Sequence, residues 1–407
     1  MMRRYWFSIL ISLFIIVGLG TYYVYGATDR LPEYKLLTIE GDVKEGAKIQ
    51  LQGSYIGGRG SEIVTVTTEG SDYPSRQSVY RKELSGAARS WLYAQPDIRE
   101  VIKDHRSFMR GKGSYTSLYK DEEWIIYAEP VGNSGNISSS KVVLNIDILN
   151  LSSGKVRHFE PIIEEQVTHS FVTDVQLIDD QIHVLSLVYP LGDGDNFDYH
   201  DYIVDMNSGT LMNNLNLTSG FKVKDNTQLN FSGITNDTFS APSDHAILVV
   251  LEEKKLEKDN QGRTLFDEYP YSYEYKTGKL TALSDIQKGT GLTGNGFYRL
   301  EGSLFSSLRV EPKLITMSRY NIETGKADND VISLTAQQIG ADAIKGAIMK
   351  AGRIYILFHK NGIPMATVVD ETNGDIVYKG EVVFDGDESE RKEHLENVQL
   401  LNMQIVE

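Results

Sequence analysis

A repeated turn pattern constrains this chain more than any other feature of its sequence. Five segments share the order apolar, Asn/Asp/Glu, usually apolar, any residue, Ser/Thr/Asn, Gly, polar, apolar. Their glycines are 55, 69, 47 and 49 residues apart and are Gly154, Gly209, Gly278, Gly325 and Gly374. Alternating residues are typical of a strand, and a small polar residue followed by glycine is typical of a turn. Each segment therefore predicts a hairpin between antiparallel strands.

Four of these turns follow an apolar run rich in β-branched and aromatic residues, at residues 123–127, 181–185, 245–249 and 353–357. Such runs suit buried inner strands. Repeats of this length fit a four-stranded blade of a β-propeller with variable loops. Unrelated hairpins in a sandwich are the alternative, but the two-part unit recurs in order, which favours the propeller.

On this repeat, residues 113–407 resemble the bacterial extracytoplasmic β-propellers of the quinoprotein-like, sheet-repeat class. The resemblance implies blades around a central channel, closed between the two ends of the chain. We expect an all-β propeller of six blades, or of seven if residues 34–112 hold another. Residues 34–39 and 62–66 are expected to complete the last blade with residues 397–406. The tryptophan-docking signature of quinoprotein dehydrogenases is absent, because the chain has three tryptophans.

The N-terminal segment predicts a membrane anchor. Residues 5–26 are uncharged and follow Arg3 and Arg4. A helix of this length crosses a bilayer core of about 30 Å, and the arginines favour a cytoplasmic N-terminus. A cleaved signal peptide is the alternative, although a polar region before the cleavage site is missing. We expect a single-pass protein of the cell membrane, anchored by residues 1–27 and otherwise extracytoplasmic.

Composition narrows the possible partners. The formal net charge is -15, which argues against nucleic acid because duplex binding depends on Lys and Arg. The chain has no cysteine, so a lipoprotein anchor and a disulfide framework are excluded. A large extracytoplasmic chain without cysteine is typical of a bacterium.

Residues 76–112 interrupt the strand pattern between the N-terminal strands (residues 28–75) and the blades (residues 113–407). Their apolar residues have helical spacing, with Pro96 starting a second helix. Nine Lys or Arg against four acidic residues give this insertion a net charge of +5. One interpretation is a helical hairpin packed on an acidic flank of the propeller. The other is a docking surface for an acidic partner or an anionic membrane, formed by Arg99, Lys103, Arg106 and Arg110.

One acidic loop is a candidate Ca²⁺ site. Asp193, Asp195 and Asp198 lie within residues 191–202, and Ca²⁺ sites need several oxygen ligands. The segment is not an EF-hand, because Asp198 takes the position of the central glycine and Val204 that of the final glutamate. A solvated loop is the alternative interpretation. No other cofactor is predicted, since the histidines show no zinc-motif spacing.

Residues 266–275 are rich in aromatic residues. If this segment is a strand, the alternation of side chains places Tyr271, Tyr273 and Tyr275 on one face. We interpret them as an aromatic ladder in a blade rather than as a sugar-stacking platform.

These features favour a non-catalytic binding or sensory module for a membrane or cell-envelope partner. No GxSxG nucleophile motif is present. An enzyme (hydrolase, lyase or dehydrogenase) with its site at the channel mouth is the alternative, because propeller sites assemble from distant blades. A structural cell-envelope protein is the third possibility.

Overall fold

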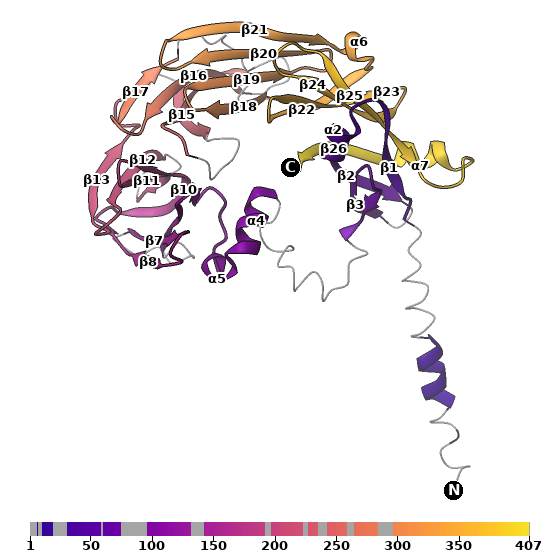
Figure 1. The fold of residues 1–407 in the computed structure, drawn as a ribbon, viewed down its shortest axis with the longest axis horizontal. Coiled ribbons are helices and arrows are strands. Elements are labelled where there is room, and N and C mark those ends of the chain that lie inside the picture. Colours follow the sequence, from indigo (N-terminus) through magenta and orange to yellow (C-terminus); the bar gives the residue numbers. More distant parts are fainter. Residues whose placement is uncertain are drawn as a thin grey trace.

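The computed structural model describes residues 6, 10–18, 31–57, 60–74, 96–131, 142–191, 197–222, 227–234, 242–258, 264–283 and 296–406. These residues form a mostly β structure of six antiparallel sheets, with five short helices between strands (Figure 1). The helices are α2 (Val43–Ala47), α4 (Pro96–Asp104), α5 (Arg106–Met109), α6 (Ala336–Ile339) and α7 (Arg391–Asn397).

The first three sheets follow the chain order. Sheet I contains β5 (Leu118–Lys120), β6 (Trp124–Val131), β7 (Val142–Asn150) and β8 (Val156–Phe159), and β9 (Ile162–Ile163) also pairs with β7. Sheet II contains β10 (Val167–Ile178), β11 (Gln181–Pro190), β12 (Asp198–Asp205) and β13 (Leu211–Asn216). Sheet III contains β14 (Thr227–Ile234), β15 (His245–Lys258), β16 (Thr264–Glu274) and β17 (Lys279–Ala282).

The last two sheets recruit strands from the N-terminal part of the chain. Sheet IV contains β18 (Gly296–Glu301), β19 (Leu304–Val310), β20 (Leu314–Asn321) and β21 (Lys326–Thr335). Sheet V contains β22 (Ala343–Lys350), β23 (Arg353–Lys360), β24 (Ile363–Asp370), β25 (Ile376–Phe384) and, at its edge, β1 (Tyr34–Gly41). Sheet VI contains β26 (Val398–Ile405), β2 (Ile49–Gly57), β3 (Gly60–Val66) and β4 (Ser71–Asp72).

The five repeated glycines all occupy the turn between the third and fourth strands of a sheet, in sheets I to V. Their φ angles lie between 66° and 79°, a region that glycine adopts without steric cost. In each turn the glycine N–H donates to the carbonyl of the residue four positions earlier, at 2.9 Å. The prediction of a repeated antiparallel unit is therefore confirmed.

Neighbouring sheets pack face to face around an arc. Separate clusters of buried apolar side chains join sheets I and II, II and III, III and IV, IV and V, and V and VI. In sheets II and IV the first strand lies on the inner side of the arc and the last strand on its outer side (Figure 1). This is the stacking expected of propeller blades.

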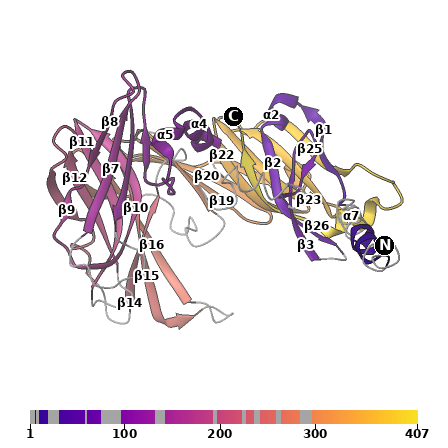
Figure 2. The ribbon, with the colours of Figure 1, turned by 90° about the horizontal axis from the view of Figure 1, so that it is seen from below.

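The expected closure into a ring is not found in the described part of the chain. No apolar cluster among the described residues joins sheet VI to sheet I. Instead, α4 and α5 cover the free face of sheet I, where Ile98, Val101, Phe108 and Met109 pack against Leu118, Ile125 and Tyr127. Figure 2 shows both helices between the two end sheets. The helices thus take the apolar face that a sixth sheet contact would use, and the described sheets form an open arc.

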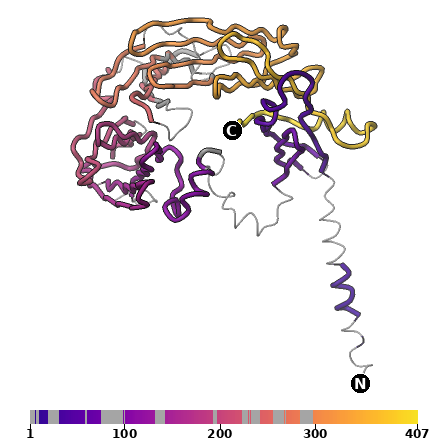
Figure 3. Tube along the Cα trace, viewed as in Figure 1, coloured from indigo at the N-terminus to yellow at the C-terminus, as the bar shows by residue number. Residues whose placement is uncertain are grey.

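The two ends of the chain meet in sheets V and VI. β26 pairs with β2, so C-terminal residues 398–405 lie beside residues 49–55. β1 does not join that sheet but pairs with β25 in sheet V, from Tyr34 opposite Phe384 to Gly41 opposite Tyr378. The C-terminus lies on the inner side of the arc (Figure 3).

Only residue 6 and residues 10–18 of the predicted membrane anchor are described, and they are helical. No helix among the described residues combines the length and the apolar character needed to span a bilayer. The other residues of the predicted anchor lie outside the described part of the chain, and the anchor stays a prediction.

Replacing Gly53 with alanine is expected to lower the free energy of unfolding by about 1–3 kcal/mol. A Cβ atom at Gly53 would lie 1.9 Å from the carbonyl oxygen of Gln399, a backbone atom of the paired strand β26. Denaturant unfolding measures the change, and hydrogen exchange should show faster exchange in β26. Gly346→Ala in β22 is the matched control, because nothing lies within 4 Å of the place that its Cβ atom would take and the strand is also irregular there. Equal stability of the two variants would contradict the prediction.

Candidate ligand-binding site

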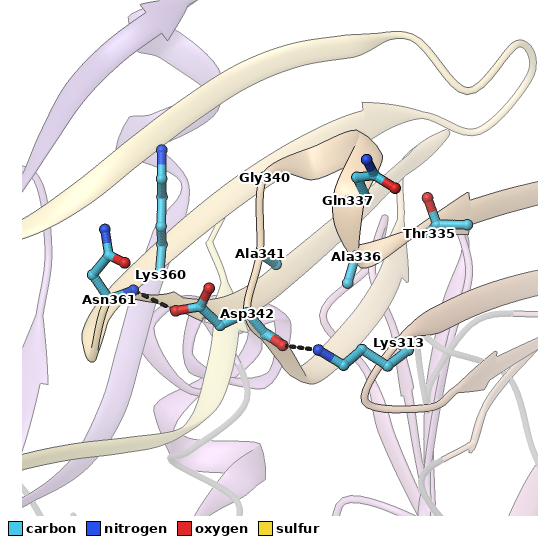
Figure 4. Close-up of a pocket in the computed structure, with 9 residues that line it drawn as sticks. All are labelled: Lys313, Thr335, Ala336, Gln337, Gly340, Ala341, Asp342, Lys360 and Asn361. Carbon is cyan, nitrogen blue, oxygen red and sulfur yellow. Dashed lines mark hydrogen bonds between the residues drawn. The ribbon is translucent and has the colours of Figure 1, made fainter.

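A pocket of about 450 Å³ lies where sheet IV passes into sheet V, beside α6. We call it the α6 pocket. Its walls come from the residue before β20, the end of β21, α6 and the segment after it, and the end of β23 with the turn that follows (Figure 4). The lining residues are Lys313, Thr335, Ala336, Gln337, Gly340, Ala341, Asp342, Lys360 and Asn361.

Local sequence explains why the chain turns at this point. Thr335 caps α6: its hydroxyl accepts the Gln338 N–H, and the Gln338 side chain accepts the Thr335 N–H. Gly340 ends the helix in the left-handed conformation at φ 73°, where its N–H donates to the carbonyl of Ala336. Ile339 is buried in the core between sheets IV and V. The single helical turn is therefore fixed at both ends and on one face.

The acidic group of the pocket is engaged by the backbone. The Asn361 N–H donates to the Asp342 carboxylate at 2.5 Å, and the Lys313 ammonium donates to the Asp342 carbonyl at 2.5 Å. Burial and the positive charge of nearby Lys345 lower the pKa of His359, which precedes Lys360 in β23, although Asp342 opposes this shift.

Three polar side chains of the pocket are available to a ligand. The Lys360 ammonium and the side-chain amides of Gln337 and Asn361 have no hydrogen-bond or ion-pair partner among the described residues. In Figure 4 Lys360 and Asn361 lie at one edge of the pocket and Gln337 lies at the opposite edge, on α6, with Gly340 and Ala341 between them. None of the pocket residues belongs to the site residues predicted from the sequence.

The predicted basic surface on α4 and α5 is partly described. Lys103, Arg106 and Arg110 are exposed, whereas the side chain of Arg99 lies outside the described residues. Lys112, at the end of the insertion, forms an ion pair with Asp147 of β7 at 2.7 Å. α4 begins at Pro96, as the sequence predicts, and its apolar face is fixed on sheet I.

The predicted Ca²⁺ site stays a prediction. Asp193 and Asp195 lie outside the described residues, and Asp198 accepts a hydrogen bond from the Thr218 hydroxyl at 2.8 Å. Within the described ranges, no group of three or more potential metal-binding side chains is found.

A buried polar cluster between sheets II and III was missed by sequence reasoning. Asp201 accepts hydrogen bonds from the Tyr273 hydroxyl at 2.6 Å and lies 2.7 Å from Nδ1 of His183. Asp174 accepts from the Tyr275 hydroxyl at 2.6 Å and from the Gln176 amide at 3.1 Å. All six side chains are buried, with at most 3% exposure, which identifies the cluster as part of the core. Tyr273 and Tyr275 share one face, as predicted, and their rings contact each other edge to face with centroids 5.2 Å apart. Their hydroxyls also reach across to sheet II.

A second buried cluster joins sheets IV and V. The Glu371 carboxylate lies 2.6 Å from the guanidinium groups of both Arg299 and Arg319. In the sheet register Ser306 stands directly opposite both arginines, so the three side chains share one face of sheet IV. Glu371, from the β24–β25 turn, reaches across to this face, and the side chains of Glu371 and Arg299 are only 3% and 4% exposed.

Comparisons with known proteins leave the family open. No protein-family model matches the chain, and no curated protein matches it. Solved structures that match part of this chain include an uncharacterised protein from Listeria monocytogenes, with 11% identity, a TM-score of 0.34 and coverage of 65% of this chain and 64% of that chain. The Dos1 propeller has 11% identity, a TM-score of 0.28 and coverage of 61% and 57%. The periplasmic gluconolactonase of Pseudomonas aeruginosa has 9% identity, a TM-score of 0.31 and coverage of 88% and 99%.

The matched region spans less than two thirds of the first of these structures and of the Dos1 propeller. The similar structures include a lactonase, a peptidase and proteins whose descriptions state no reaction. The comparisons therefore leave the activity of this chain undecided.

Asp174 is expected to make stability depend on pH. Burial, helped by the charge of Asp201, raises the pKa of Asp174 to about 6, against about 3.9 in an unfolded chain. Between these values the folded protein holds a proton that the unfolded chain has released. The contribution of Asp174 to stability is therefore greatest below pH 4 and falls as the pH rises to 6, by about 3 kcal/mol in total.

Asp174→Asn removes this titration. The difference in free energy of unfolding between the wild type and Asp174→Asn, measured from pH 4 to pH 7, isolates the group from the other carboxylates. We expect the wild type to lose stability relative to the variant as the pH rises through 6. A difference that stays constant over this range would show that Asp174 is ionised throughout.

Proposed function

We propose that this chain is a membrane-anchored, extracytoplasmic protein of the propeller type that acts as a non-catalytic binding module for an acidic protein partner. The carrying observation is the fixed basic face of α4 and α5. Lys103, Arg106 and Arg110 are exposed while the opposite face of the helices is buried on sheet I. The exposed carboxylates of Glu100 and Asp104 lie on the same helix α4, so the three cations leave this face with one net positive charge. In a chain of net charge -15, even this small positive charge favours binding to an acidic surface.

Two further features support binding rather than catalysis. The carboxylate of the α6 pocket is engaged by a backbone N–H, and the His183–Asp201–Tyr273 group is buried in the core. The anchor is part of the proposal because residues 5–26 are uncharged and follow two arginines. In this arrangement the six blades lie outside the cell, next to the membrane surface and the partner.

Charge reversal tests the binding surface. The full-length protein, expressed in its native membrane and cross-linked, is compared with Lys103→Glu/Arg106→Glu and with the control Lys279→Glu/Lys326→Glu. The control changes the net charge equally at exposed lysines of β17 and β21. We expect one cross-linked protein partner to be lost from the α4–α5 variant and retained by the control.

Loss or retention of the partner in both variants would refute the proposed surface. If the purified wild type instead binds phosphatidylglycerol vesicles and the α4–α5 variant does not, the surface serves the membrane. The anchor is tested separately by alkaline extraction of membranes, where we expect the protein to stay in the pellet. Its release into the supernatant would overturn the anchor and leave the binding surface untouched.

A further inference from the structure

We infer that the α6 pocket is a binding site for an anionic sugar, a ligand of monosaccharide size that carries a carboxylate or phosphate group. This site is separate from the proposed partner surface: its residues lie in sheets IV and V, whereas α4 and α5 cover sheet I.

The charge of the pocket selects an anion. Lys313 and Lys360 line it together with one carboxylate, that of Asp342, which leaves one net positive charge on the lining. A third lysine is close, since the ammonium of Lys379 lies 3.6 Å from the position that a Cβ atom on Gly340 would take. Lys313 and Asp342 already hold backbone groups, so Lys360 is the cation free to pair with a ligand oxyanion.

The rest of the lining selects a polar ligand. Small-molecule sites typically enclose about 300–1,000 Å³ and are mostly apolar. The α6 pocket has a volume in that range, but its lining is divided almost evenly between polar and apolar surface, with Ala336 and Ala341 the only purely aliphatic side chains. The free amides of Gln337 and Asn361 each offer one acceptor and two donor hydrogens, which match hydroxyl groups. Amides beside an ammonium therefore fit a hydroxyl-rich molecule with one anionic group.

Titration calorimetry on the full-length protein in detergent tests this inference with four probes: glucuronate, glucose 6-phosphate, glucose and inorganic phosphate. We expect at least one of the two anionic sugars to bind at least about tenfold more tightly than glucose, which corresponds to about 1.4 kcal/mol. Competition by inorganic phosphate would identify a phosphate rather than a carboxylate as the preferred anion. Failure of both anionic sugars to bind, or equal binding of glucose, would overturn the inference.

Two variants assign binding to this pocket. Lys360→Gln is expected to weaken binding of the anionic sugar at least about tenfold. Gln337→Ala is also expected to weaken binding, by an amount that changes little with salt concentration. Lys326→Gln, an exposed lysine of β21, is the matched control and should bind as the wild type does. Circular dichroism and the thermal midpoint check that each variant is folded. Wild-type affinity in both folded pocket variants would place the sugar elsewhere on the protein.

Discussion

Replacing Glu371 with alanine is expected to lower the free energy of unfolding by about 3–5 kcal/mol, because the buried guanidinium of Arg299 loses its buried carboxylate and keeps only the exposed Glu301. Glu371 is the carboxylate that both Arg299 and Arg319 contact at 2.6 Å. Arg299 lies in the interior, with a side chain 4% exposed, so water cannot replace the lost carboxylate. Since Glu371 belongs to sheet V and the arginines to sheet IV, the loss also weakens the contact between these sheets.

Glu301 provides a matched control on the same arginine. Its carboxylate lies 3.3 Å from Nε of Arg299 but is 57% exposed, and exposed ion pairs typically contribute about 0–1 kcal/mol. Urea unfolding of Glu371→Ala and Glu301→Ala, followed by circular dichroism, measures both changes. Similar losses in the two variants would show that Glu371 does not hold the arginines in the way described.

Replacing Asp201 with alanine is expected to lower the free energy of unfolding by about 2–6 kcal/mol, since a buried donor that loses its acceptor costs about 1–3 kcal/mol and two donors are affected. The Tyr273 hydroxyl and the His183 ring both contact this carboxylate, and Asp201 has no exposed surface. Burial and the neighbouring Asp201 charge raise the pKa of Tyr273, so its hydroxyl stays protonated and remains a donor.

A double-mutant cycle separates this pair from the general cost of a core substitution. Tyr273→Phe removes only the hydroxyl, so Asp201→Ala should cost less in the Tyr273→Phe background than in the wild type. Thermal unfolding of the four proteins gives the coupling energy. Strict additivity of the two substitutions would mean that the hydrogen bond contributes nothing to stability.

The sequence predicts the repeating part of this fold well because each hairpin turn is encoded locally. In each turn the side chain of the first residue accepts a hydrogen bond from a later residue of the same turn, as Asn321 does from the N–H of Thr324. A glycine with positive φ, here Gly325, comes next in the sequence. Sheet VI lacks the repeated turn sequence, and its strand order explains why. Its strands come from opposite ends of the chain, and its last turn uses Thr67 and Gly70, with the Thr67 N–H donating to the Gly70 carbonyl.

The candidate site was not predictable in the same way. Lys313 precedes β20, Gln337 lies in α6 and Lys360 ends β23, and these three places meet only because sheets IV and V stack. No local motif marks such a meeting point, and each residue alone is typical of a solvated loop. The same holds for Asp201 and Tyr273, which are 72 positions apart. For that pair, the polar His183 within an apolar strand was the one signal available.

The strand pairing at the chain ends has a consequence for synthesis. Gly41 of β1 pairs with Tyr378 of β25, 337 residues later, and β2 pairs with the still later β26. At about 5–20 residues per second, roughly 20 s to 1 min pass between the appearance of β1 and that of its partner. During this interval the edges of β1 and β2 lie open to other strands. Sheets I to IV can form first, because all their strands precede β25 in the chain. Exposed strand edges of this kind are where chaperones bind and where nascent chains aggregate. The ends of this chain are thus the part of the molecule that depends most on protection while it is being made.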